Sequence, residues 1–223
     1  LLKVGVQGRR LHPHVLPPRN LVSLVDVSGS MQSPDKLPLL VAGLGLLVDT
    51  LRPQDRVAIV VYAGAAGVVL PSTSGRDRSI IRGALARLEA GGSTNGAGGI
   101  RLAYQLAHRH FVDGGINRVV LATDGDFNVG VTGDAELTAL IEEERETGVS
   151  PTALGFGTGN YQDARMELLA DRGNGNYHYV DDLDEAHRVL VRAASGTLWT
   201  IAEDVKIQLR FDPARVRGYR LIG

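Results

Sequence analysis

Three oxygen-bearing residues stand at alternate positions early in the chain. Asp26, Ser28 and Ser30 lie in the stretch LVSLVDVSGSMQSPDK, directly after an apolar run. In a loop that leaves a strand, this spacing lets three side chains turn toward one centre, and Gly29 permits the necessary turn. One carboxylate and two hydroxyls form an all-oxygen group that suits Mg²⁺, Mn²⁺ or Ca²⁺. The same residue types also serve nucleophiles, phosphate sites, helix caps and ordinary turns.

Two later segments carry further candidate ligands. GGSTN, residues 91–95, presents Thr94 in a glycine-rich turn, and TDGD, residues 123–126, places Asp124 where another apolar run ends. Thr94 alone is equally compatible with a loop that leads into a helix. Together with Asp26, Ser28 and Ser30, however, these residues favour a cation site over isolated turns.

Other chemistries have weaker support. DGDFN begins like a calcium-binding EF-hand loop, but the sixth and twelfth positions are Val129 and Ala135 instead of glycine and glutamate. GFGTGN, residues 155–160, lacks the third glycine of a dinucleotide-binding motif, and the chain has no Walker A sequence. Ser28 does not stand in a G-x-S-x-G nucleophile motif. A metal-dependent hydrolase remains open, because a bound metal ion can activate water.

Apolar runs and amphipathic stretches alternate along the middle of the chain. Strands are predicted at 21–26, 56–64, 67–71, 117–125, 150–157 and 175–180, and helices at 36–51, 78–88, 100–111, 134–147, 163–170 and 183–193. This alternation predicts a doubly wound α/β fold, with a mostly parallel sheet covered on both faces. Ligands of such sheets bind beyond the carboxyl ends of the strands. Asp26 and Asp124 should therefore meet at one edge.

The two ends of the chain have a different character from the middle. Residues 1–19 combine a weakly alternating segment with a proline-rich linker, residues 20–195 form the predicted α/β domain, and residues 196–223 follow it. Val205 to Phe211 alternate apolar and polar residues, which is typical of a half-exposed antiparallel strand. We expect short flanking β segments at both ends, paired in a small unit, and we expect the chain to be part of a longer protein.

Composition narrows the possible partners. The chain has 223 residues, 25 acidic and 24 basic residues, and a net charge of −1, so no basic surface points to nucleic acid. Cysteine is absent, which excludes disulfides and thiolate chemistry. No apolar run approaches the ~18 residues of a membrane span. We therefore expect neither nucleic-acid binding nor membrane insertion by this chain.

The candidate residues resemble a known arrangement. Asp26-x-Ser28-x-Ser30, Thr94 and Asp124 look like the metal-ion-dependent adhesion site (MIDAS) of von Willebrand factor type A (VWA) domains, in the same order along the chain. The resemblance covers roughly residues 20–195. The phrases VDVSGSM, PQDRVAIVVYAG and ATDGDFNVG are similar to a bacterial, envelope-associated branch of that family.

The resemblance implies a function as well as a Rossmann-like fold. Ser28 and Ser30 would bind the cation directly, Thr94 and Asp124 directly or through water, and Asp26 often through water. Mg²⁺ is the expected ion, with Ca²⁺ or Mn²⁺ as alternatives. Its open position would accept an Asp or Glu from a protein partner.

The expected role is therefore a protein-binding module in adhesion or assembly, not an enzyme. Its expected location is the bacterial cell envelope or another extracytoplasmic place. Gly91 and Gly92, with the loops around Met31 and Phe127, would form the rim of the site. The alternatives are a scaffold subunit of an envelope or chaperone-like complex, a metal-dependent hydrolase, or a site that binds no metal.

Overall fold

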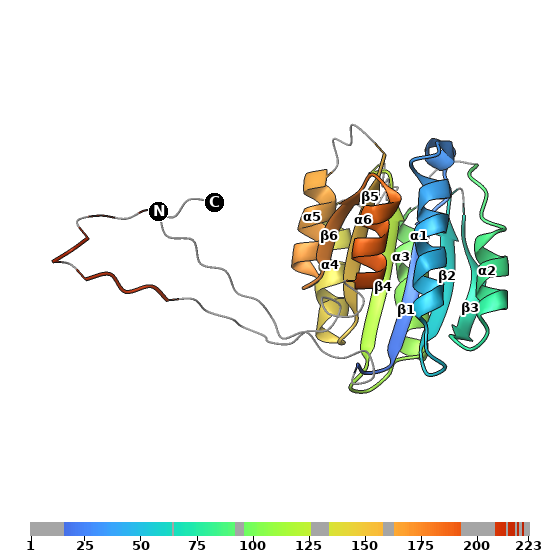
Figure 1. The fold of residues 1–223 in the computed structure, drawn as a ribbon, viewed down its shortest axis with the longest axis horizontal. Coiled ribbons are helices and arrows are strands. Elements are labelled where there is room, and N and C mark those ends of the chain that lie inside the picture. Colours follow the sequence, from blue (N-terminus) through green and yellow to red (C-terminus); the bar gives the residue numbers. More distant parts are fainter. Residues whose placement is uncertain are drawn as a thin grey trace. The chain divides into compact units, whose positions relative to one another are not determined.

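The computed structural model describes residues 16–63, 65–91, 96–125, 134–157 and 163–192, and, near the end of the chain, residues 208–212, 214–216, 218 and 220. The chain divides into two compact units, Arg9–Trp199 and a unit formed by Leu1–Gly8 with Thr200–Gly223. The first of these units holds all the strands and helices of the described residues (Figure 1).

Six strands form one sheet in the order β3-β2-β1-β4-β5-β6. Their bounds are Arg19–Asp26 for β1, Arg56–Tyr62 for β2, Ala66–Ser74 for β3, Ile116–Thr123 for β4, Ser150–Phe156 for β5 and Asn176–Val180 for β6. β3 pairs antiparallel with β2, and all other pairs are parallel. Because the chain builds outward from β1 first through β2 and then through β4, these two neighbours of β1 mark a topological switch point.

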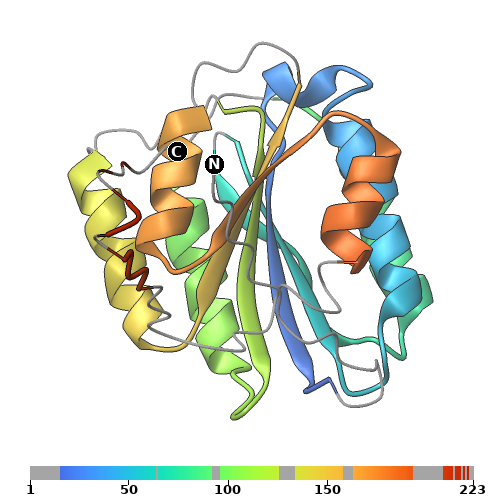
Figure 2. The ribbon, with the colours of Figure 1, turned by 60° about the vertical axis from the view of Figure 1, so that its left-hand side comes forward.

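Helices cover both faces of the sheet (Figure 2). Their bounds are Leu37–Thr50 for α1, Arg78–Leu85 for α2, Gly96–Arg109 for α3, Asp134–Glu146 for α4, Asp163–Arg172 for α5 and Leu183–His187 for α6. A short 3₁₀ helix, η2, spans Gly29–Gln32, and a π-helical turn, η3, spans Arg188–Arg192. No helix of the described residues is long and apolar enough to cross a membrane.

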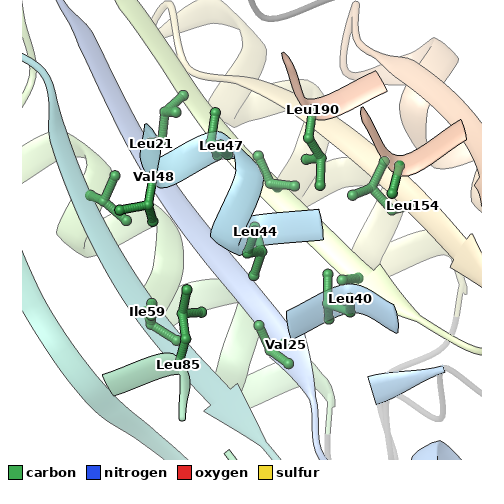
Figure 3. Packing of buried hydrophobic residues seen from close by; sticks show 14 of the residues in the cluster. Leu21, Val25, Leu40, Leu44, Leu47, Val48, Ile59, Leu85, Leu154 and Leu190 are labelled. Atoms are coloured by element: carbon green, nitrogen blue, oxygen red, sulfur yellow. The ribbon is translucent and has the colours of Figure 1, made fainter. Parts of the chain in front are cut away.

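Each face has its own hydrophobic core. On one face the leucines of α1 at three- and four-residue spacing, Leu40, Leu44 and Leu47, pack against β1 and β2 residues such as Val25 and Ile59 (Figure 3). A second cluster lies on the opposite face, beneath α3, α4 and α5. β1 and β4 are buried at every position, as central strands covered on both sides must be. The site-bearing strands are therefore the most firmly packed part of the sheet.

A buried carboxylate joins the amino-terminal ends of β1 and β2. Asp55, whose side chain is fully buried, accepts hydrogen bonds from the guanidinium groups and backbone amides of Arg19 and Arg52. Arg52 also donates to the carbonyls of Leu16 and Pro17, which fixes the chain where it enters β1. Burial alone would raise the pKa of Asp55, but the hydrogen bonds and charge of the arginines outweigh it and lower the pKa to about 2.

Most predicted elements are present, but two helices end several residues earlier than predicted. The predicted helix over 183–193 is wrong as one α-helix, because α6 ends at His187 and continues as the π-helical turn η3. α2 ends at Leu85 instead of residue 88. The flanking β segments stay a prediction: residues 208–212 lie outside regular secondary structure, and the rest of that alternating stretch and residues 1–15 are outside the described residues.

Candidate metal centre

Asp26 ends β1 between its two neighbouring strands and is completely buried. Its Oδ1 accepts a hydrogen bond from the backbone amide of Ser28 at 2.8 Å. Its Oδ2 accepts from Tyr62 Oη on β2 at 3.1 Å and from Thr123 Oγ1 on β4 at 3.0 Å. Burial raises the pKa of Asp26, and these hydrogen bonds only partly offset that effect. Asp26 therefore fixes the direction in which the chain leaves β1.

The two serines project from the loop and the 3₁₀ turn that follow. Ser28 precedes η2 and is buried, Ser30 lies within it and is exposed, and their Oγ atoms are 3.0 Å apart. Met31 belongs to the hydrophobic core and is fully buried, so the loop around it can contribute to the predicted rim only through other residues, such as the exposed Gly29 and Ser30. Burying an apolar residue here anchors the turn, in which Ser30 stays exposed.

Asp124 follows β4, directly beside the end of β1. Its side chain is only 4% exposed, and its Oδ2 accepts a hydrogen bond from Lys36 Nζ at 2.8 Å. The same ammonium group donates to the carbonyl oxygen of Ser30 at 2.9 Å. The loops after β1 and β4 are thus joined through a positive charge.

The structure describes only some of the remaining residues of this region. Thr94, Gly92 and Phe127 lie outside the described residues, as do Asp126 and Asn128. Gly91 is described: it is exposed, and its amide donates to the carbonyl of Val27 at 2.7 Å. Gly91 therefore lies beside the loop after β1. The structure brings Asp26, Ser28, Ser30 and Asp124 to one edge of the sheet, and the part played by Thr94 stays a prediction.

This set of residues fits a hard cation. Oxygen atoms from hydroxyl and carboxylate groups are the ligands that Mg²⁺, Mn²⁺ and Ca²⁺ prefer. Among the described residues, no group of three or more Asp, Glu, His or Cys side chains is placed to hold a metal ion, and the candidate oxygens here include two serine hydroxyls. Asp124 and the Ser30 carbonyl already hold an ammonium group between them, which shows that these oxygens can face a positive charge.

Three residues of this region were not among the predicted site residues. Tyr62 and Thr123 hold Asp26, and they stand at the carboxyl ends of the strands on either side of it, a position that becomes informative once the strand order is known. Lys36 precedes the first residue of α1. A lysine there is a signal visible in the sequence, because a positive charge is unfavourable at a helix amino terminus.

Comparisons with known proteins agree with the fold. A family model described as von Willebrand factor type A domain matches residues 20–192, and one described as "Uncharacterized protein YfbK, C-terminal" matches residues 196–223. YfbK of Escherichia coli strain K12 is 48% identical over 223 residues, which are all of this chain and 39% of that protein. The chain thus spans well under half the length of this relative.

Solved structures of bacterial proteins share the architecture. BatB from Bacteroides thetaiotaomicron superposes with a TM-score of 0.66 at 20% identity, covering 79% of this chain and 97% of that one. An aerotolerance-related membrane protein from Bacteroides fragilis gives a TM-score of 0.61 at 25% identity, covering 78% and 97%. With its switch-point sheet and a family model that matches most of its length, the chain belongs to the von Willebrand factor type A domain family.

Proposed function

We propose that this chain is a protein-binding module that holds a divalent cation, Mg²⁺ in the first instance, and recognises an acidic side chain of a partner protein. The observation that carries this proposal is the convergence of Ser28, Ser30 and Asp124 beyond the ends of the two central strands. Thr94 completes the proposed ligand set.

Each residue has a distinct part in this proposal. Asp26 orients the loop through three hydrogen bonds and keeps the amide of Ser28 in place. Ser28 and Ser30 offer neutral hydroxyl oxygens, and Asp124 offers a carboxylate beside them. Because the hydroxyl ligands are neutral, the described residues place no more than two carboxylates near the ion, which leaves a bound divalent cation able to accept a carboxylate from another protein.

Binding is favoured over catalysis by the arrangement of the hydroxyls. Ser28 Oγ and Ser30 Oγ hydrogen-bond to each other, whereas an activated serine nucleophile needs a base within hydrogen-bond reach. We infer that the serines serve as ligands, and that the module is not an enzyme.

We also infer a place at the bacterial cell envelope. This inference is supported by the similar fold of a protein named as an aerotolerance-related membrane protein. The chain covers 39% of its relative YfbK.

A capture experiment tests the proposal. The 223-residue chain is immobilised and exposed to a detergent extract of bacterial envelopes in Mg²⁺ or in EDTA, beside an Asp124→Ala variant. We expect one set of proteins to bind only in Mg²⁺ and only to the unaltered chain, and binding to be lost when an acidic residue of the captured protein is replaced. Identical captured sets in all arms would overturn the proposal, as would turnover of phosphate or carboxylic esters in Mg²⁺ or Mn²⁺.

A further inference from the structure

The ammonium group of Lys36 lies between the two loops that form the candidate metal centre. It donates to Asp124 Oδ2 at 2.8 Å and to the carbonyl of Ser30 at 2.9 Å. One contact is to a proposed metal ligand and the other to the backbone of a second one. Lys36 therefore occupies the neighbourhood in which a divalent cation would be held.

The fold provides space for the stem of this lysine. Gly157, which directly follows β5, has a φ of +85°, and a Cβ added there would lie 2.4 Å from Lys36 Cε. Tyr179 Oη, from β6, donates to the carbonyl of Gly157 at 2.8 Å and holds that backbone in place. The lysine stem thus lies in a gap that any other residue type at position 157 would narrow.

The surroundings of Lys36 make a helix-capping role a poor explanation. Its side chain makes no capping hydrogen bond at the start of α1, and a positive charge near a helix amino terminus is unfavourable. The carboxylate of Asp124 is 4% exposed, and a buried charge requires a partner. The ion pair therefore stabilises the buried charge of Asp124 and does not stabilise the start of the helix.

The charges of these residues imply that Lys36 and a divalent cation compete for Asp124. The formal charges of Asp26, Asp124 and Lys36 sum to −1 when Asp26 is ionised. A divalent cation added while Lys36 stays in place would change this net charge to +1. A cation bound to the same carboxylate would repel the ammonium group at close range. Replacing the ammonium by the divalent cation makes the group neutral instead.

We propose that Lys36 is an internal cation that pairs with Asp124 in the metal-free protein and must leave before a divalent cation binds. The proposal rests on the proposed function, because it concerns the same site. Lys36 then sets the metal concentration at which the module becomes able to bind its partner. Its departure also removes a donor from the Ser30 carbonyl, which couples metal binding to the η2 turn.

A lysine replacement tests this competition directly. Lys36→Met keeps an unbranched apolar stem and removes the charge. Mn²⁺ binding to the full 223-residue chain is measured by electron paramagnetic resonance for the unaltered protein, Lys36→Met and Arg82→Met. Arg82 is the matched control, since it forms an exposed ion pair with Asp49 between α2 and α1, away from the residues of the site.

Removing the competitor should tighten Mn²⁺ binding. If Lys36 pairs with Asp124 in about nine of ten molecules, the dissociation constant for Mn²⁺ falls about tenfold in Lys36→Met and is unchanged in Arg82→Met. Equal affinity in all three proteins, or weaker binding by Lys36→Met, would overturn the role of Lys36 but leave the metal site standing. Absence of Mn²⁺ binding by every protein would instead overturn the proposed function, and the inference with it.

A second measurement needs no variant and so does not depend on the folding of one. The chain has three lysines, Lys3, Lys36 and Lys206, so acetylation of each can be followed by mass spectrometry. We expect Mg²⁺ to raise the acetylation rate of Lys36 several-fold relative to Lys3 and Lys206 in the same sample. An unchanged or slower relative rate, at Mg²⁺ concentrations shown to saturate the site, would contradict the displacement of Lys36.

Discussion

At the scale of single residues, the two aspartates of the centre have different surroundings. Asp26 is surrounded by neutral donors from its own loop and from both adjacent strands. Asp124 instead pairs with a charged group, the ammonium of Lys36. Asp26 is therefore suited to holding the loop in shape, and Asp124 to exchanging one positive charge for another.

The role assigned to Asp26 can be checked through Tyr62. Replacing Tyr62 by phenylalanine removes one hydrogen bond from a buried carboxylate, and we expect the free energy of unfolding to fall by about 1–3 kcal/mol. Urea denaturation at neutral pH measures this change. Tyr104→Phe is a matched control, because Tyr104 Oη is buried and has no hydrogen-bond partner among the described residues. Equal losses of stability in the two variants would contradict this role of Tyr62.

At the scale of elements, the candidate metal centre and the buried Asp55 group lie at opposite ends of the strands. The carboxyl ends of β1 and β4 carry Asp26 and Asp124, while the amino-terminal ends of β1 and β2 are tied together by Asp55 with Arg19 and Arg52. β1 connects the two groups, because Arg19 stands at its amino-terminal end and Asp26 at its carboxyl end. The loops of the candidate metal centre can therefore change without loosening the entry to β1.

The Asp55 group should govern part of the acid stability. Its pKa is about 2 in the folded protein and 3.8 as the reference value, so the unfolded chain takes up a proton first as the pH falls. Stability from this group is fully present above about pH 4 and is lost between about pH 4 and pH 2, a total of roughly 2 kcal/mol. Urea denaturation across this pH range measures that loss.

Asp55→Asn provides the comparison. It leaves Arg19 buried without its charged partner, so we expect unfolding at pH 7 to cost about 3 kcal/mol less than in the unaltered protein. The difference in the free energy of unfolding between the variant and the unaltered protein should become smaller toward pH 2. Asp49→Asn, which alters an ion pair whose side chains are 48% and 59% exposed, should leave the pH dependence unchanged. If the free energy of unfolding changed with pH in the same way for Asp55→Asn and the unaltered protein, the role of Asp55 in acid stability would be contradicted.

At the scale of the whole molecule, much of the architecture follows from the sequence. The apolar runs of β1 and β4 and the leucine spacing of α1 directly reflect burial, so strands, helices and the shared edge for Asp26 and Asp124 could be predicted. The antiparallel direction of β3 could not, because an apolar run does not encode the direction of its partner strand. Nor could the burial of Met31, since the four-residue helix η2 is too short to show a periodic pattern.

The contact between Lys36 and Asp124 could not be predicted from the sequence, for a related reason. Lys36 and Asp124 are 88 positions apart, and only the strand order brings them together. A single sequence shows the charge of Lys36 but not the carboxylate that it faces. Local pattern thus identifies ligands within one loop more readily than a contact made across two loops.

The central claim is that the serine hydroxyls belong to a cation site, and Mn²⁺ binding to a serine variant tests it most directly. A double variant, Ser28→Ala with Ser30→Ala, removes two oxygen atoms without changing the charge. Ser33→Ala is the control, since Ser33 lies just after the same turn and hydrogen-bonds Asp35.

We predict that the unaltered chain and Ser33→Ala each bind one Mn²⁺ and that the double variant loses this binding while its far-ultraviolet circular dichroism is retained. Mn²⁺ binding of equal strength by a folded double variant would contradict the account, as would its absence from the unaltered chain.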